Sequence, residues 1–285
     1  MVISGKTRIC GVIGDPIEHT LSPIIHNAAF EALEIDYLFL AFRVKSEDVE
    51  KAMSGMRALN IHGLNVTMPH KNAVIQYMDE VDPTCKITGS ANTILKKDER
   101  LFGFNTDGVG ALNALEKNGV AVRGKKVLLL GAGGAAKAIA YTLSQEAEEL
   151  VILNRTAKPA AELAYLLKQK FNKKIRADEL SPNAVEDNLA DAHVLINATS
   201  VGMNPNADQT PVAPELLKPD LAVLDIVYNP IETKLAKDAK AAGAKVVSGV
   251  EMLIYQGAAS FEIWTACNAP VEVMRKAALN HLRKV

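Results

Sequence analysis

Cysteine and histidine are scarce in this sequence, and neither sign of charge is in excess. The three cysteines, Cys10, Cys85 and Cys267, are odd in number and far apart, so we expect reduced thiols and a cytoplasmic protein rather than a disulfide framework. The six histidines have no ligand-like spacing, so no metal site is expected. The net charge of −1 indicates no basic surface for nucleic acid or an anionic membrane.

Long apolar runs are absent as well. No stretch of about 18 apolar residues occurs, so no membrane span is expected, and the first residues, MVISGKTRICG, lack the apolar core of a signal peptide. What is present, 48% hydrophobic and 23% charged residues, is enough to bury a sizeable core. A chain of 285 residues predicts two domains or one large one, and we expect a small-molecule ligand and a monomer or homodimer.

The first hundred residues alternate strand and helix patterns, which is typical of an α/β domain with a mixed sheet. Ser22, before Pro23, is a candidate N-cap of the first helix. A helix is predicted over 69–81, so Lys71 would lie near its start, and a hairpin is predicted around 98–100. The strand patterns are 8–14, 37–44, 63–67, 91–97 and 101–105, and the other helical patterns are 22–34 and 46–60.

A second series of alternating strands and helices begins near residue 125. It predicts a parallel, doubly wound sheet of the Rossmann type. The two helical patterns after residue 249 are too short to form a core of their own, so we expect them to pack on the N-terminal domain. The predicted domains are therefore 1–107 together with 250–285, and 108–249.

The segment VLLLGAGGAAKA carries the strongest local signal. An apolar strand, Val127–Leu130, runs directly into the turn GAGGAA, where a helix begins. This is the G-x-G-x-x-A form of the dinucleotide fingerprint, in which glycines let the backbone approach a pyrophosphate and the helix N-terminus binds the anion. Glycines that merely pack a helix on a strand are the alternative, and the strand–turn–helix context favours a cofactor site.

The end of the following strand indicates which nicotinamide cofactor binds. NAD-specific sites usually have Asp or Glu about 20 residues after the fingerprint, where the carboxylate bonds the ribose 2′-hydroxyl. This chain has Asn154, Arg155 and Thr156 instead. Arg155 can pair with a 2′-phosphate that a carboxylate would repel, so the sequence favours NADP. A solvated loop charge is the alternative for Arg155.

Short polar residues gather at the strand ends of the first domain, namely Asn65, Thr67, Asn92, Thr106 and Asp107. Ligands of α/β folds bind at the carboxyl ends of strands, and this set has many donors and acceptors but little charge. It suits a ligand with several hydroxyls. Helix capping is the alternative for Ser22, Thr67 and Asp107 singly, but it explains their gathering less well.

In order and spacing, the motifs resemble the shikimate dehydrogenase family over nearly the full chain: GDPIEHTLSPIIHN, NVTMPHK, GSANT, GFNTDG, GAGGAAKA, NRT, NATSVGM, DIVYNP and YQGAASFEIW. The resemblance implies NADPH-dependent, reversible reduction of 3-dehydroshikimate to shikimate, on the route to chorismate and aromatic amino acids. It implies a substrate domain and a Rossmann domain facing across a cleft. It also implies Lys71 and Asp107 as the catalytic pair. The substrate-binding candidates are Thr20, Ser22, Asn65, Thr67, Lys71, Asn92, Asp107, Tyr228 and Gln256.

Within that set, the resemblance implies that Thr20 and Ser22 bind the substrate carboxylate. The cofactor-binding candidates are Gly131, Ala132, Gly133, Gly134, Ala135, Asn154, Arg155, Thr156, Lys158, Thr199, Ser200, Met203, Ile226, Gly249 and Met252. The family usually has serine at Thr20, and the extra methyl narrows the pocket, which bears on the preference between shikimate and quinate. Many members have a further arginine where Lys158 and Pro159 stand, and Lys158 is the candidate substitute for it.

The reaction requires a group that stabilises and protonates the oxygen on which negative charge develops as hydride arrives. Lys71 can supply both a cation and a proton, and Asp107 would orient the lysine and bond the adjacent hydroxyl. Two other functions stay open. One is a dual quinate and shikimate dehydrogenase that uses NAD, and the other is a non-catalytic NADP-binding sensor, which would have little need for Lys71 together with Asp107.

Overall fold

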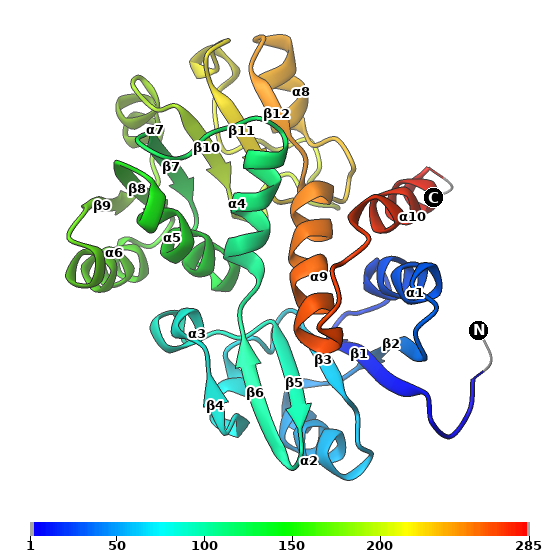
Figure 1. Cartoon of the computed structure of the whole chain (residues 1–285). Helices are drawn as coiled ribbons and strands as arrows, with labels where there is room; N and C mark the ends of the chain where they lie inside the picture. Colours follow the sequence, from blue (N-terminus) through cyan, green and yellow to red (C-terminus); the bar gives the residue numbers. More distant parts are fainter. Residues whose placement is uncertain (1–2, 284–285) are drawn as a thin grey trace. The chain divides into compact units, whose positions relative to one another are not determined.

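Two six-stranded sheets organise the computed structural model, which describes residues 3–283 (Figure 1). One sheet is mixed and the other is wholly parallel, which confirms the predicted α/β class. Each sheet belongs to its own compact unit. The first unit contains the residues up to Thr106 and those from Ile254 onward, and the second contains Asp107–Leu253.

The sheet of the first unit has the strand order β2-β1-β3-β5-β6-β4. β1 pairs in parallel with β2 and β3, whereas β5 pairs antiparallel with β3 and β6, and β4 adds in parallel to β6. The β5–β6 pair is the hairpin predicted around residues 98–100. The strands are β1 (Arg8–Gly14), β2 (Tyr37–Arg43), β3 (Gly63–Val66), β4 (Glu80–Val81), β5 (Thr93–Lys97) and β6 (Arg100–Phe104).

Helices cover both faces of this sheet, because its strands are apolar on both sides. On β3, Leu64 and Val66 join a core with α2, while Gly63 and Asn65 face α9 on the other side, as the two-residue period of a strand requires. α1 and α10 pack on each other in the layer with α9. The helices are α1 (Ser22–Ala32), η1 (Ser46–Asp48), α2 (Val49–Ala58), η2 (Ala73–Tyr77), α3 (Pro83–Thr88), α9 (Gly249–Thr265) and α10 (Val271–Leu282).

The helix predicted over 69–81 does not form. Only the short 3-10 helix η2 occupies that stretch, and the chain then joins the sheet as β4. Asp79 explains the difference, since its N–H donates to Leu101 O at 2.9 Å and its carboxylate accepts from Leu101 N at 2.7 Å. These bonds pair the segment with β6. Lys71 therefore lies in a turn before η2, and no α-helix dipole acts on it.

The second unit is built on a parallel sheet of order β12-β11-β10-β7-β8-β9. This is the doubly wound order, with the reversal between β7 and β10, where such folds bind ligands. The sequence patterns did not mark β9. The strands are β7 (Lys126–Leu130), β8 (Glu149–Asn154), β9 (Lys174–Glu179), β10 (Val194–Asn197), β11 (Ala222–Asp225) and β12 (Lys245–Val247).

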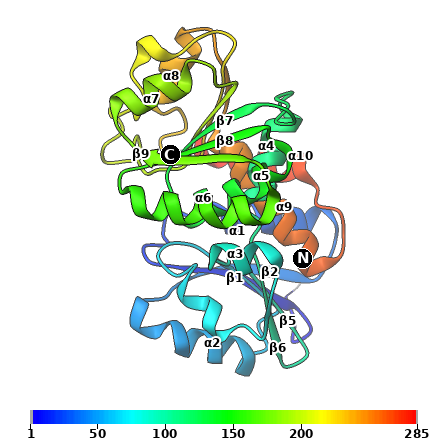
Figure 2. The same ribbon diagram turned by 90° about the vertical axis from the view of Figure 1, so that its left-hand side faces the viewer.

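Helices flank both faces of the parallel sheet, as Figure 2 shows, with α5 and α6 on one side and α7 and α8 on the other. The α7 and α8 side is sealed by a core that includes Val185, Leu189, Leu235 and Ala239, packed on buried strand residues. α4 packs along α5. The helices are α4 (Asp107–Lys117), α5 (Gly134–Glu146), α6 (Ala157–Phe171), α7 (Pro182–Leu189), η3 (Pro214–Leu216) and α8 (Lys234–Ala241).

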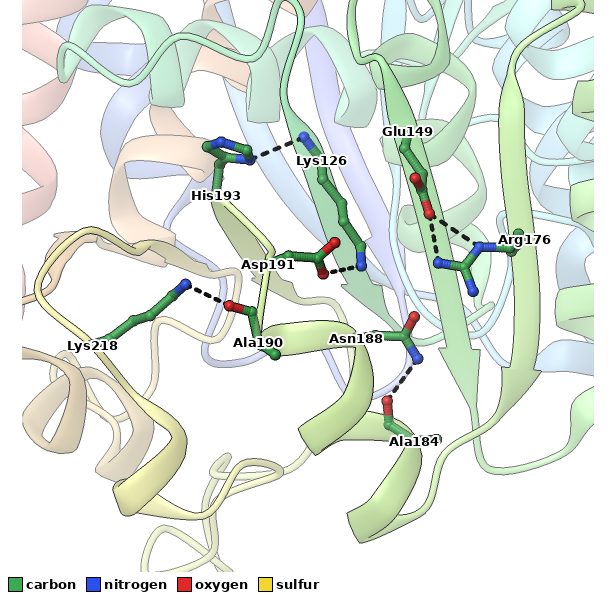
Figure 3. Close-up of polar contacts among 9 residues, drawn as sticks. All are labelled: Lys126, Glu149, Arg176, Ala184, Asn188, Ala190, Asp191, His193 and Lys218. Carbon is green, nitrogen blue, oxygen red and sulfur yellow. Dashed lines mark hydrogen bonds and ion pairs between the residues drawn. The ribbon is translucent and has the colours of Figure 1, made fainter.

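Polar contacts tie the strands together at the amino-terminal edge of this sheet (Figure 3). Lys126, the first residue of β7, forms an ion pair with Asp191, and its backbone N–H donates to His193 Nδ1 at 3.3 Å. Arg176 donates from Nε to Glu149 at 3.0 Å. Lys126 and Arg176 border a polar hollow of about 600 Å³ beside α7. These charges satisfy one another, so this hollow is a structural feature, away from the carboxyl ends of β7 and β10.

Candidate active site

α9 places one row of side chains on the sheet of the first unit. Gln256, Ser260 and Trp264 are four residues apart and so share one face of the helix. The indole N–H of buried Trp264 donates to Ile94 O on β5 at 3.0 Å. A Cβ on Gly63 would lie 2.4 Å from the indole Nε1, so glycine is needed for the ring to lie on β3. This contact holds Ser260 and Gln256 near the carboxyl end of β3.

Asn65, at that end of β3, is the centre of a buried polar network. Its Nδ2 donates to Asn92 O at 3.1 Å, to Thr93 Oγ1 at 3.2 Å and to Ser260 Oγ at 3.1 Å. A backbone carbonyl can only accept, so Asn92 O fixes the carboxamide with its nitrogen inward. Asn65 Oδ1 is buried, and it has no hydrogen-bond partner among residues 3–283.

Asn92 continues the network, and its orientation is fixed in the same way. The backbone N–H of Thr106 donates to Asn92 Oδ1 at 2.8 Å, so Oδ1 must face that amide. Asn92 Nδ2 then donates to Thr106 Oγ1 at 2.9 Å and to Gln256 Oε1 at 3.3 Å. Ser260 Oγ donates to Gln256 O at 3.0 Å. We call Asn65, Asn92, Thr93, Thr106, Gln256 and Ser260 the polar network.

The turn that carries Lys71 is anchored on both sides. His70 Nε2 lies 2.6 Å from Val44 O and is therefore its donor. Lys71 O accepts from Ala91 N at 2.9 Å, and Asn72 Nδ2 donates to Gly89 O at 2.9 Å. These bonds fix the backbone of Lys71 next to the segment that contains Asn92. The lysine is half-buried.

Thr20 and Ser22 form a hydroxyl pair at the start of α1. Thr20 Oγ1 accepts from Ser22 N at 3.3 Å and donates to Ser22 Oγ at 3.2 Å. α1 begins at Ser22, and its N-cap Leu21 provides no side-chain bond, so capping by Ser22 is wrong. A Cβ on Gly14 would lie 2.4 Å from the methyl of Thr67, so Gly14 makes room for that side chain. Adjacent hydroxyls at a helix start suit a carboxylate.

The fingerprint turn of the second unit has the geometry of an anion site. Gly131 has φ of +110°, and a Cβ there would lie 2.7 Å from Ala198 O, so the turn adjoins the end of β10. A Cβ on Gly133 would meet nothing within 4 Å, so backbone is open to a ligand there. α5 begins at Gly134 without a side-chain cap, which leaves its first amides available. These features fit a pyrophosphate.

The candidate 2′-phosphate residues follow β8. Asn154 connects them to the fingerprint, since its Oδ1 accepts from Ala132 N at 3.1 Å and its Nδ2 donates to Thr156 O at 2.9 Å. Arg155 is exposed, with no hydrogen bond or ion pair to any residue the structure describes. Exposed Lys158 lies 4.0 Å from Glu162, a weak surface pair. Arg155 is thus the better-placed cation for a phosphate.

The loops after β10 and β11 share a buried anchor that the sequence analysis missed. Asn197 Nδ2 donates to Asp225 Oδ1 at 3.0 Å, and Thr233 donates to Asp225 Oδ2 at 2.6 Å. Burial raises the pKa of Asp225, although these bonds oppose the shift. Thr199 donates its hydroxyl hydrogen to Asn197 Oδ1 at 2.7 Å. The hydroxyl of Thr199, a predicted cofactor residue, is therefore used in a hydrogen bond that stabilises the loop after β10.

The other predicted cofactor residues after β8, and the predicted substrate residue Tyr228, belong to the second unit. Ile226 N donates to Asn197 O at 3.1 Å, and a Cβ on Gly249 would lie 2.7 Å from Ile226 O, so these two positions pack together. Burial raises the pKa of the Tyr228 phenol. The remaining members are exposed Ser200, partly exposed Met203 and buried Met252.

Known proteins match along the whole chain. A family model described as shikimate dehydrogenase substrate binding domain matches residues 12–94, one described as shikimate / quinate 5-dehydrogenase matches 113–237, and one described as shikimate 5'-dehydrogenase C-terminal domain matches 249–279. The shikimate dehydrogenase (NADP(+)) of Methanopyrus kandleri is 49% identical, covering 99% of this chain and 98% of the relative. The chain belongs to the shikimate dehydrogenase family.

Solved structures of this family agree with the fold. A shikimate dehydrogenase crystallised in complex with NADP+ has a TM-score of 0.92 and 41% identity, covering 99% of this chain and 98% of that one. The Listeria monocytogenes shikimate 5-dehydrogenase, in complex with shikimate and NAD, has a TM-score of 0.91 and 35% identity, covering 97% of this chain and 98% of that one.

No helix within residues 3–283 is long and apolar enough to span a membrane. The same residues contain no group of three or more His, Cys, Asp or Glu placed to hold a metal.

Among the predicted substrate residues of this family member, the structure joins Asn65, Asn92 and Gln256 directly through the polar network. Thr93 and Ser260, which the sequence analysis did not select, complete it. Ser260 could have been found from its spacing of four residues after Gln256 on one helix. Thr93 could not, because its role arises from pairing between strands far apart in sequence.

Proposed function

We propose that the chain is an NADP-dependent shikimate dehydrogenase that reversibly reduces 3-dehydroshikimate to shikimate. The polar network is the observation that carries this proposal beyond family membership. Its members are buried except for half-buried Gln256, backbone groups fix the amide orientations of Asn65 and Asn92, and it contains no charged side chain. Such a set is complementary to ring hydroxyls, which both donate and accept. Thr20 and Ser22 supply a hydroxyl pair for the substrate carboxylate.

Lys71 and Asp107 are proposed to carry the proton chemistry. Bound NADPH supplies the hydride. As the carbonyl oxygen gains charge, Lys71 stabilises the charge and gives it a proton, and it takes the proton back in the reverse direction. Asp107, the buried first residue of α4, orients the lysine and bonds the neighbouring hydroxyl. The backbone anchors of Lys71 support this role, because a proton donor must be held in one position.

Lys71→Ala tests the catalytic assignment. We expect loss of most of kcat, by roughly 100-fold to 10,000-fold, while binding of shikimate is largely kept. Initial rates of NADPH formation give kcat, and calorimetric titration of shikimate gives affinity. Lys86→Ala, an exposed lysine on α3, is the matched control. Near-normal turnover by Lys71→Ala would remove Lys71 from the mechanism.

Arg155→Ala tests the cofactor preference. A charge-assisted phosphate contact contributes about 1.5–3 kcal/mol, so KM for NADP+ should rise roughly 10-fold to 150-fold, while KM for NAD+ stays unchanged. Arg123→Ala, which removes an exposed arginine of the same unit, is the control. Equal effects on NADP+ and NAD+ would mean that Arg155 does not read the 2′-phosphate.

Parallel assays with shikimate and quinate, each with NADP+ and NAD+, separate the alternatives. Strong turnover of quinate with NAD+ would favour a dual dehydrogenase, and turnover of neither acid would favour an NADP-binding sensor. We also propose a cytoplasmic location and a monomeric or homodimeric state. Size-exclusion chromatography with light scattering measures the latter.

A further inference from the structure

His26 is an ionisable side chain buried in the first unit, outside the polar network. It lies on α1 with no exposed surface, stacked on Phe39 at a centroid distance of 4.4 Å and an interplanar angle of 11°. The ring centroid of Trp264 is 5.2 Å away and that of Phe30 is 6.2 Å. The position is set by the next residue, Asn27, whose amide bonds both Phe39 O and Phe39 N on β2.

Both ring nitrogens of His26 lack a hydrogen-bond partner among residues 3–283. A buried polar group without a hydrogen-bond partner is unfavourable, so packing alone does not account for a histidine in this aromatic cage. Burial lowers the pKa of His26 to about 3, so the ring is neutral and has one N–H donor and one acceptor. The Asn65 amide is close enough to oppose that shift in pKa.

Asn65 has an acceptor atom that could receive the N–H of His26. Its Nδ2 is committed to Asn92 O, Thr93 and Ser260, and its Oδ1 is the buried acceptor without a partner. The buried imidazole of His26, which the Asn65 amide approaches closely enough to affect its pKa, carries an N–H that has no acceptor among residues 3–283. A Cβ on Gly257 would lie 3.6 Å from His26 Nε2, so the ring reaches the α9 turn next to Ser260.

We propose that His26 is a positioning residue that donates its ring N–H to Asn65 Oδ1 through one buried water and thereby holds the Asn65 nitrogen toward the polar network. The imidazole fixes the oxygen side of the carboxamide, and Asn92 O fixes its nitrogen side. An amide held from both edges cannot flip, so the network keeps one pattern of donors and acceptors for the substrate hydroxyls. The effect on catalysis rests on the proposed function.

His26→Leu and His26→Gln test this role by steady-state kinetics. Leu has a similar volume and no polar atoms, whereas Gln can still donate an N–H. We expect KM for shikimate to rise about tenfold in His26→Leu and to return to within about threefold of wild type in His26→Gln, with KM for NADP+ unchanged in both. In an Asn65→Ala background, His26→Leu should have no further effect on KM.

Phe30→Leu is the matched control, because it disturbs the same aromatic cage without removing a donor. It should lower the melting temperature and leave KM unchanged. If Phe30→Leu raises KM as much as His26→Leu does, or if His26→Gln fails to restore KM, His26 acts only through packing and the proposal is wrong.

A measurement without turnover separates this proposal from the proposed function. ¹⁵N NMR of the histidine rings should show His26 in a single neutral tautomer from about pH 5 to about pH 8. Asn65→Ala should shift the resonance of the protonated ring nitrogen. A resonance unchanged by Asn65→Ala overturns the proposal, even if the enzyme oxidises shikimate. A shifted resonance supports it, even if shikimate proves not to be the substrate.

Discussion

Mild acid should destabilise the first unit by protonating His26. The imidazole titrates near 6.5 when exposed, and burial lowers its pKa to about 3 in the folded protein. The unfolded chain therefore binds the proton more readily between these values, so the stability that the neutral ring contributes is nearly complete above pH 6.5 and is lost as pH falls toward 3. Proton linkage gives a loss of about 0.2 kcal/mol at pH 7 and about 2 kcal/mol at pH 5.

Urea unfolding at pH 7 and pH 5 measures this loss, with Trp264, the single tryptophan, as the probe of the first unit. The free energy of unfolding of wild type should fall by about 2 kcal/mol more than that of His26→Leu between these pH values. His62, whose pKa is also lowered by burial, titrates in both proteins and cancels in the comparison. Equal pH dependence in the two proteins would refute the assignment of a buried, neutral His26.

Two further predictions concern the packing of Trp264 on β3 and the buried carboxyl group of Asp225. Gly63→Ala places a Cβ 2.4 Å from Trp264 Nε1 and should lower the free energy of unfolding by about 3 kcal/mol in urea, whereas Gly55→Ala, which meets nothing within 4 Å on α2, should raise it by about 0.5–1 kcal/mol. Asp225 has a raised pKa, so its stabilising effect is present below pH 3.8 and is lost as pH rises. The free energy of unfolding of wild type should therefore fall relative to Asp225→Asn between about pH 4 and pH 7, and a constant difference contradicts this.

Local patterns in the sequence predict much of this fold. The fingerprint turn is readable because its strand, glycines and helix are adjacent in the chain, and the structure has all three at the expected positions. The hairpin around Asp98 is readable for the same reason. β4 is not, because this two-residue strand depends on pairing with β6, including the bonds between Asp79 and Leu101, 22 residues away. Such pairing overrides helical periodicity and leaves no local signal.

The sequence likewise predicts some features of the candidate site and not others. Residue types such as Asn65 and Asn92 could be selected from the sequence, because short amides at strand ends are uncommon without a ligand or a turn. The direction in which each amide points could not, since it depends on Asn92 O and on the backbone N–H of Thr106. The direction of each donor and acceptor decides which arrangement of hydroxyls the site binds. Substrate specificity therefore could not be predicted from the sequence patterns alone.

The resemblance selects Lys71, and the structure adds a physical reason for its position. The sequence pattern predicts a helix start beside it, and that helix does not form. The structure offers a different restraint: the carbonyl of Lys71 accepts from Ala91 N, and Asn72 is bonded to Gly89 O. Both partners lie in the short segment before Asn92. One segment thus fixes the backbone of the proposed proton donor and supplies an amide of the polar network, so a shift in one would move the other.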